Sequence, residues 1–316
     1  MVNLMKNEVG KSSIFREDKK AYIIAEIGLN HNGELQMAKD MITAAAKAGA
    51  DAVKFQNWKA EDFIVDRSET VTYTSQRKEV TESFFDLCKR NEMKSGWIPI
   101  LKDYCLDLRT DFISTPTTNE GVDDLINEGI KVIKNGSDYL GHIPLLKYMG
   151  QKAEVVIIST GMATLDEIEH AVEVLRNNSC EPTVLHCTSA YPTPYSEANL
   201  SAIETIRKSI GCEVGWSDHT VDPGVIHRAI HKWDAKIIEF HLDLDGKGEE
   251  FESGHCWLPE QIGSVIKQVR HAENADGDGI KKPVPSEVSD RLWRTDPLDG
   301  LRPFKSIRNS FNADTK

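Results

Sequence analysis

The sequence predicts one (β/α)₈ barrel, also called a TIM barrel, in which helices surround a closed ring of parallel strands. Eight short runs rich in β-branched residues recur along the chain, and stretches of helical spacing separate most of them. The length of 316 residues suits a single barrel of roughly 250 residues. Eight strands favour closure, because open doubly wound sheets usually stop at about five or six.

The elements follow in a regular order. Residues 1–20 are polar, and we expect an arm or a small hairpin there. The predicted strands are 22–27, 52–56, 111–115, 131–135, 155–159, 183–187, 213–217 and 235–241. Apolar residues at spacings of three and four predict helices within 35–46, 122–126, 165–175, 200–210 and 262–269. Thr164 and Glu167 form a capping box at the start of the third helix.

Two regions depart from this regular alternation of strands and helices. Residues 68–102 exceed the length of one strand–helix connection, so we expect a loop as well as a helix there. After about Asn274 the composition changes to ADGDG, KKPVPSE and a polar tail. The sequence therefore predicts a catalytic barrel over 21–273 and an extended segment without a second core over 274–316.

Composition and charge exclude several classes of protein. The net charge of −12 argues against nucleic acid or an anionic membrane as the main partner. The six cysteines contain no CxxC pair, which indicates reduced thiols and not a disulfide framework. The N-terminus lacks an apolar signal region, and no run approaches the roughly 18 apolar residues of a membrane helix. We expect a cytoplasmic protein.

Polar side chains gather at the carboxyl ends of the strands, where barrel enzymes place their active sites. Period-two alternation assigns residues of one strand to a common face. The sets are Ile24 and Glu26; Ala52, Lys54 and Gln56; Val184, His186 and Thr188; Gly215, Ser217 and His219; and Ile237, Glu239 and His241. Repetition of the pattern on five strands predicts a polar barrel mouth above an apolar interior.

This mouth is suited to a phosphorylated anion. Burial of Lys54 and Lys134 without a partner would cost several kcal/mol, so both lysines need an anion. Four residues add hydroxyl donors: Thr115, Ser137, Ser159 and Ser217. The sequence has neither a Walker loop nor GxGxxG, which argues against a nucleotide held in those ways.

Two histidines form a candidate metal site. His219 and His241 lie at the ends of the seventh and eighth strands, which are neighbours in a barrel. With a carboxylate from Glu239 or Glu26, they could bind Mn²⁺ or Mg²⁺. His186, in contrast, is interpreted as a core residue.

Several long motifs resemble the sialic acid synthase family. They are AEIGLNHNG (25–33), AGADAVKFQ (48–56), STP (114–116), IISTGMATLDEI (157–168), HCTSAYPTPYSEANL (186–200) and SDHT (217–220). The resemblance covers about residues 21–245. It implies a barrel enzyme that condenses phosphoenolpyruvate with an N-acylated amino sugar, either N-acetylmannosamine or a 2,4-diacetamido sugar. The products would be a nonulosonic acid and phosphate.

The resemblance also implies roles for individual residues. Phosphoenolpyruvate would contact Lys54, Thr115, Lys134, Ser137, Ser159, Ser217 and His219. The sugar would lie among Glu26, Gln56, Tyr191 and Asp138, and the metal would bind His219 and His241. Glu26, Lys54 and Glu239 are the candidate catalytic residues, with the two glutamates as candidates for proton transfer. A homodimer is the expected assembly.

Three departures from the family pattern concern the sugar half of the site and the C-terminus. The acidic residue after Ser137 comes one place early, at Asp138. Gly254 stands where an aspartate usually precedes the counterpart of His255. The residues after Asp290 are too few for the antifreeze-like domain of many members; Arg291, Arg294 and Arg302 could act as a substitute arm, or this segment could pack on the barrel.

Two other functions remain open from the residues alone. A Schiff-base aldolase would use Lys134 or Lys54 as its nucleophile. An inactive, sugar-binding barrel would explain the departures at Asp138 and Gly254. Retention of both lysines and both histidines argues against the inactive barrel.

Overall fold

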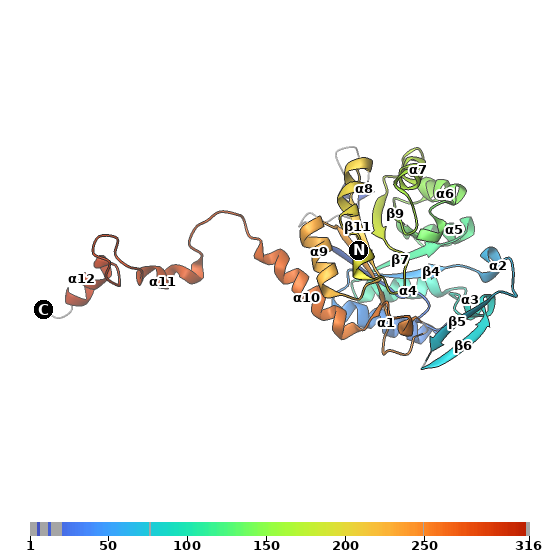
Figure 1. Cartoon of the computed structure of the whole chain (residues 1–316), viewed down its shortest axis with the longest axis horizontal. Coiled ribbons are helices and arrows are strands. Elements are labelled where there is room, and N and C mark those ends of the chain that lie inside the picture. The colour runs from blue at the N-terminus through green and yellow to red at the C-terminus, as the bar shows by residue number, and fades with distance from the viewer. Residues whose placement is uncertain (1–4, 7–11, 14–20, 76, 249, 314–316) are drawn as a thin grey trace. The chain divides into compact units, whose positions relative to one another are not determined.

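The computed structural model describes residues 5–6, 12–13, 21–75, 77–248 and 250–313. Its core contains eight parallel strands that overlap all eight predicted runs. These are β3 (Tyr22–Glu26), β4 (Ala52–Asn57), β7 (Asp111–Pro116), β8 (Val132–Asn135), β9 (Val155–Ser159), β10 (Thr183–Cys187), β11 (Val214–Asp218) and β12 (Ile237–Leu242). The ring closes because β11 pairs with both β10 and β12. The predicted (β/α)₈ barrel is confirmed (Figure 1).

Helices occupy the connections between successive barrel strands, and a last helix follows the eighth strand. They are α1 (Leu35–Ala48), α2 (Ala60–Phe63), α3 (Phe84–Arg90), α4 (Trp97–Asp107), α5 (Asn119–Asn127), α6 (Ile143–Lys152), α7 (Leu165–Arg176), α8 (Ala202–Ile210), α9 (Pro223–Trp233) and α10 (Pro259–Ala275). The capping box of Thr164 and Glu167 is present at the start of α7. All five predicted helical stripes lie in or overlap these elements.

The long connection after β4 holds more structure than the sequence predicted. An antiparallel pair, β5 (Thr70–Ser75) and β6 (Lys78–Ser83), precedes α3. The sequence of β5, TVTYTS, consists largely of β-branched and aromatic residues, which favour a strand although its apolar content is low. Near the N-terminus, β1 (Met5–Lys6) pairs with β2 (Ser12–Ser13), and the rest of the predicted arm lies outside the described residues.

Short elements complete the chain. Four 3₁₀ turns and one further strand are η1 (Ser137–Tyr139), η2 (Tyr195–Glu197), η3 (Phe251–Ser253), η4 (Pro285–Glu287) and β13 (Cys256–Trp257). The helices α11 (Val288–Leu292) and α12 (Lys305–Ala313) belong to a compact unit, Ala272–Lys316, that is distinct from Met1–His271. Among the described residues, no helix is both long and apolar enough to span a membrane.

An apolar layer fills the barrel below its carboxyl end. The layer is built from inward side chains of the strands: Tyr22, Ile24, Ala52, Ile113, Val132, Val155, Ile157, Leu185 and Ile237. Gly215 makes this packing close, because a Cβ there would lie 2.4 Å from the carbonyl oxygen of Ile237 and 2.7 Å from Leu185 Cδ2. The next inward residues toward the carboxyl end are polar, so this layer is the floor of the site.

His31 makes the stability of this fold depend on pH. Its ring is fully buried against Trp97 and Phe55, and Nδ1 accepts the backbone N–H of Gly33 at 3.0 Å. Burial lowers the pKa of His31 to about 4. In the unfolded chain His31 takes up a proton near pH 6.5. Its contribution to the free energy of unfolding is therefore complete above pH 6.5 and is lost as pH falls toward 4. At pH 5 the expected loss, relative to pH 8, is about 2 kcal/mol of unfolding free energy.

Urea unfolding of wild type and His31→Asn at both pH values measures this contribution, because the asparagine oxygen can still accept the Gly33 N–H. The difference in unfolding free energy between pH 8 and pH 5 should shrink by about 2 kcal/mol in this variant. His170→Asn is the matched control, since His170 is exposed. Equal pH dependence of wild type and His31→Asn would contradict the assignment.

Candidate active site at the barrel mouth

A cavity of about 400 Å³ opens at the carboxyl ends of the barrel strands. Every residue predicted to form the site lines it. From the strands come Glu26, Lys54, Gln56, Thr115, Lys134, Ser159, Ser217, Glu239 and His241, and from the segments that follow them come Ser137, Asp138, Tyr191 and His219. Side chains from seven strands therefore converge on one space. Alternation had predicted polar ends on five strands; four of these sets reach the cavity, but the set Val184, His186 and Thr188 on β10 does not.

The cavity also contains residues that were not predicted. They are Trp58, Thr117, Gly136, Tyr139, Cys187, Glu250, Ser253 and His255, of which His255 alone was noted as a counterpart of a family residue. On β10 the inward residues are Leu185 and Cys187, so His186 faces away from the cavity. His186 instead makes a hydrogen bond with the Ala198 carbonyl at 3.0 Å. Continuation of the alternation from Leu185 would have identified Cys187.

Two lysines and two glutamates form a buried ionic cluster just above the apolar floor of the cavity. The ammonium of Lys54 lies 2.5 Å from Glu26 Oε2 and 3.9 Å from Glu239 Oε2. Lys134 Nζ lies 3.7 Å from Glu239 Oε1. No more than 5 % of any of these four side chains is exposed. Glu239 therefore lies between two positive charges.

Hydroxyl and amide groups fix the members of this cluster. Lys134 donates to the Ser159 hydroxyl, and Lys54 donates to Thr115 Oγ1 at 3.3 Å. Ser217 Oγ donates to Glu239 Oε1 at 3.1 Å. The remaining Glu239 oxygen, Oε2, has no hydrogen-bond partner within the described part of the chain. An added ligand would thus meet donors and acceptors already held in place.

The two lysines differ electrostatically. Burial opposes the charge on Lys54, but the carboxylates of Glu239 and Glu26 outweigh it and raise the pKa of this lysine. Burial dominates at Lys134 and lowers its pKa, with the positive charge of Lys54 acting in the same direction. Burial also opposes ionisation of Glu239, yet the ammonium groups of Lys134 and Lys54 hold its pKa below the usual range. Lys134 is therefore the ammonium that gains most from an added anion.

The loops after β8 and β9 meet at a glycine on the rim. The backbone N–H of Gly161 donates to Ser137 Oγ at 3.0 Å. A Cβ on Gly161 would lie 2.0 Å from Ser189 Oγ and 2.9 Å from Ser137 Oγ. Any larger residue would displace these hydroxyls, so Gly161 permits close approach of the loops after β8 and β10 to its own loop.

Three histidines lie together on one wall of the cavity. The ring of His241 has its centroid 5.3 Å from that of His219 and 4.7 Å from that of His255. The ring of Tyr191 covers them, at 4.3 Å from His219 and 4.8 Å from His255. Nδ1 of His219 lies 2.9 Å from the Thr188 carbonyl oxygen, which leaves Nε2 for other partners. Imidazoles that bind one ion have centroids roughly 4.5–6.5 Å apart, and the predicted pair His219 and His241 fits this range.

Glu250 reaches the same wall from the segment after β12. Its Oε2 lies 3.0 Å from Nδ1 of His241. The backbone N–H of Glu250 donates to Asn30 Oδ1 at 3.0 Å, and a Cβ on Gly28 would lie 2.4 Å from Glu250 Oε2. Burial opposes the charge on His241, but the Glu250 carboxylate raises the pKa of this histidine. Gly28 and Asn30, both from the AEIGLNHNG motif, thus make room for Glu250 and hold it.

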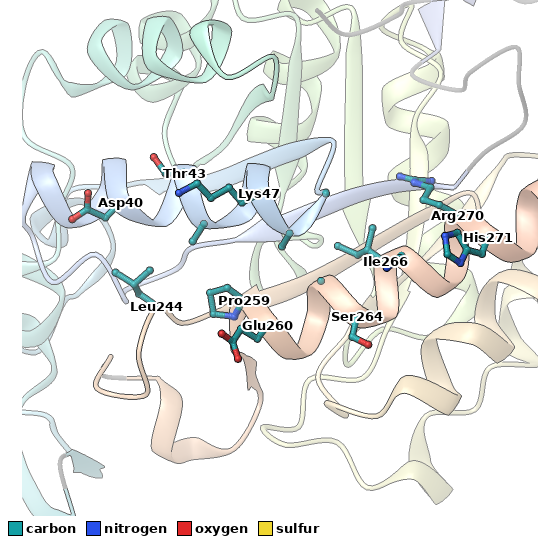
Figure 2. Close-up of a pocket in the computed structure, with 15 residues that line it drawn as sticks. Asp40, Thr43, Lys47, Leu244, Pro259, Glu260, Ser264, Ile266, Arg270 and His271 are labelled. Carbon is teal, nitrogen blue, oxygen red and sulfur yellow. The ribbon is translucent and has the colours of Figure 1, made fainter.

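A larger hollow, of about 1030 Å³, lies on the outer surface of the barrel between α1 and α10. Figure 2 shows Lys47 on α1 and Glu260 on α10 along its walls. The charged residue Arg270 is already paired with Asp51 at 2.6 Å. Buried charges do not converge there as they do in the mouth, so size alone does not make this hollow the active site.

Comparison with known proteins agrees with the motifs. The NeuB family model matches residues 41–281. The N,N'-diacetyllegionaminic acid synthase of Campylobacter jejuni is 37% identical over 273 residues, which are 85% of this chain and 81% of that protein.

Solved structures lead to the same group. The N-acetylneuraminic acid synthetase of Leptospira borgpetersenii is 29% identical, with a TM-score of 0.74 over 86% of this chain and 90% of that one. SpsE of Bacillus subtilis, a spore coat polysaccharide biosynthesis protein, is 28% identical, with a TM-score of 0.71 over 97% of this chain and 80% of that one. The resemblance inferred from the sequence is confirmed. The chain belongs to the NeuB family.

Proposed function

We propose that this protein condenses phosphoenolpyruvate with an N-acylated amino sugar, N-acetylmannosamine or a 2,4-diacetamido sugar, to give a nonulosonic acid and phosphate. The observation that carries the proposal is the convergence of two buried lysines, four hydroxyl side chains and three histidines on one barrel-mouth cavity. Relatives named as legionaminic and pseudaminic acid synthases support the reaction class.

The phosphoenolpyruvate half of the site is assigned to the lysine side of the cavity. Lys54 and Lys134 supply positive charge, and Thr115, Ser137, Ser159 and Ser217 supply hydroxyls. His219 would complete this set. Because Lys134 has a lowered pKa in the free protein, a phosphate or carboxylate beside it would restore its charged form.

The sugar half is assigned to Glu26, Gln56, Tyr191 and Asp138. Gln56 Nε2 donates to Glu26 Oε1 at 2.6 Å, so these two side chains present a linked amide and carboxylate. Tyr191 is half exposed and covers the histidines, which places an aromatic face at the entrance. Asp138 lies on the exposed rim, where it can contact a sugar hydroxyl.

The reaction forms a bond between C3 of phosphoenolpyruvate and C1 of the sugar aldehyde, whose oxygen takes up a proton. Water then adds to the cationic C2 and loses a proton, and phosphate leaves by cleavage of its bond to the C2 oxygen. The lysines and hydroxyls hold the phosphate and carboxylate in position for this step. Glu26 and Glu239 are the candidates for proton transfer. The ammonium groups of Lys134 and Lys54 hold Glu239 ionised, and its lowered pKa makes it a weaker base than an ordinary carboxylate. A divalent ion, Mn²⁺ or Mg²⁺, on His219 and His241 would supply Lewis-acid polarisation of the aldehyde.

Phosphate release from phosphoenolpyruvate tests the proposal. Purified protein, stripped of metal, is incubated with a panel of N-acylated amino sugars with and without Mn²⁺. We expect release that requires both a sugar and the metal, with a nonulosonic acid detected by mass spectrometry. His241→Ala should abolish the response to metal. Absence of sugar-dependent release across the panel would contradict the proposed function.

A Schiff-base aldolase is the second candidate, because a lysine with a lowered pKa can act as a nucleophile. It predicts covalent trapping of substrate on Lys134 by borohydride and no response to chelators. The condensation predicts no trapping and loss of activity with chelators. The same protein preparation therefore separates the two mechanisms.

A further inference from the structure

The wall of the cavity that contains His219 and His241 has further potential metal-binding atoms besides those of these two predicted ligands. Ligand atoms of His241, Glu250, His255 and Cys256 all lie within 4.8 Å of one another. Two atoms bound to opposite sides of one ion are separated by at most roughly 4.5 Å. Shifts of a few tenths of an ångström would therefore let these atoms share an ion. Glu250 was not predicted from the sequence. The proposed condensation assigns no role to Glu250 or to His255.

His255 carries an unused donor atom at this position. Its side chain is 5 % exposed, and Nδ1 is buried without a hydrogen-bond partner among the residues that the structure describes. Leaving a buried polar atom unsatisfied costs about 1–3 kcal/mol. An ion between the rings of His241 and His255 would satisfy this atom. Their centroid separation of 4.7 Å fits two imidazoles on one ion.

Glu250 is held in place for the same ion. Oε2 lies 3.0 Å from His241 Nδ1, which is the spacing of two adjacent ligand atoms around an ion with bonds of about 2.1 Å. Asn30 fixes the backbone of Glu250, and Gly28 leaves space for its carboxylate. This support comes from a strand-end loop about 220 residues earlier in the chain.

The balance of charge in the cavity also calls for a cation. Lys54 and Lys134 share the cavity with three carboxylates: those of Glu26 and Glu239, which are buried, and that of Glu250, whose side chain is 15 % exposed. Phosphoenolpyruvate would bring further negative charge into the same space. A divalent ion beside Glu250 offsets this excess.

We propose that Glu250 and His255 bind the divalent ion together with His241, so that the site has two imidazoles and a carboxylate from the β12–β13 region in addition to His219. Imidazole donors suit Fe²⁺ or Zn²⁺ better than Mg²⁺, and the Glu250 carboxylate is a donor that also suits Mn²⁺. Cys256 is not assigned as a ligand, because its sulfur lies 3.5 Å from the Asn30 amide nitrogen. The role of the ion in catalysis rests on the proposed function. Binding of the ion itself can be measured in the absence of substrate.

Binding of Mn²⁺ to the full-length, metal-stripped protein provides the test, read from the electron paramagnetic resonance signal of free Mn²⁺. Glu250→Gln removes the charge but keeps an oxygen that can accept from His241. Outer-shell partners of metal ligands change affinity by about 10–100-fold, so loss of a ligand should weaken Mn²⁺ binding by about 100-fold or more. His255→Ala is the second variant and should show a similar loss.

Glu252→Gln is the matched control, since this carboxylate lies in the same segment and accepts the backbone N–H of Arg77 at 2.7 Å. It should bind Mn²⁺ like wild type. The absorption spectrum of bound Co²⁺ gives a second readout, which should change in Glu250→Gln and His255→Ala. Thermal unfolding of each variant verifies that it is folded.

Three outcomes would overturn the proposal: wild-type Mn²⁺ affinity in Glu250→Gln, an unchanged Co²⁺ spectrum in both ligand variants, or a thiolate charge-transfer band that Cys256→Ser removes. Tight Mn²⁺ binding without turnover of any sugar would contradict the condensation alone. Metal-dependent turnover that survives Glu250→Gln with unchanged metal affinity would contradict this inference alone.

Discussion

Lys134→Met is expected to lower kcat/KM for phosphoenolpyruvate about 1,000-fold while the protein remains folded. Removal of one preorganised charge from an enclosed site typically costs 10²–10³-fold, and Lys134 is 2 % exposed and anchored by Ser159. Methionine fills a similar volume. Glu239 would keep Lys54 and Ser217 as partners, so the variant does not create an isolated buried carboxylate.

Steady-state phosphate release at saturating sugar and Mn²⁺ measures this effect. Lys131→Met is the matched control, because Lys131 lies three residues earlier, is 57% exposed and pairs with Glu154 at 2.6 Å. It should retain wild-type activity. Activity of Lys134→Met within tenfold of wild type would mean that this lysine does not bind the anion.

Much of this site was predictable from alternation along single strands. Once Ile24 and Ala52 are placed inside the barrel, Glu26 and Lys54 must follow on the same face. Parallel strands of a barrel end at one edge, so these side chains lie close to those of Lys134 and Glu239. This proximity can be predicted without knowing how the loops run. The register of a barrel thus converts a local pattern into a three-dimensional cluster.

Other parts depended on contacts that no local pattern contains. Glu250 enters the site because Asn30 binds its backbone across 220 positions of sequence, and Gly28 leaves space for its carboxylate. The β5–β6 hairpin was missed because its residues are polar and partly exposed, so no apolar alternation marked it. Loops whose course is set by distant residues therefore needed the structure.

Among the substitutions proposed here, Glu239→Gln should reduce stability most, by about 3–5 kcal/mol in unfolding free energy at pH 7. Wild-type Glu239 lies 3.7 Å from Lys134 and 3.9 Å from Lys54, and all three side chains are at most 5 % exposed. A neutral amide would leave the charge of Lys134 buried without its carboxylate. Lys54 would keep Glu26 at 2.5 Å, so the main cost falls on Lys134.

The loss of unfolding free energy in Glu239→Gln should become smaller as pH rises, because of the titration of Lys134. Its pKa is already lowered by burial, and removal of the Glu239 carboxylate lowers it further. The folded variant then binds fewer protons than the unfolded chain, in which lysine titrates near pH 10.4. Stability of the variant relative to wild type therefore increases as pH rises toward that value.

Urea unfolding at pH 7 and pH 9.5, without metal or substrate, measures both effects. Glu154→Gln is the matched control, because it removes the partner of the exposed Lys131 and should change unfolding free energy by no more than about 1 kcal/mol. Inorganic phosphate should stabilise Glu239→Gln more than it stabilises wild type, since the anion can take the place of the lost carboxylate beside Lys134. If Glu239→Gln were as stable as Glu154→Gln at pH 7, Lys134 would already be neutral in the free protein. Phosphoenolpyruvate would then have to bind together with a proton, and its affinity would fall as pH rises.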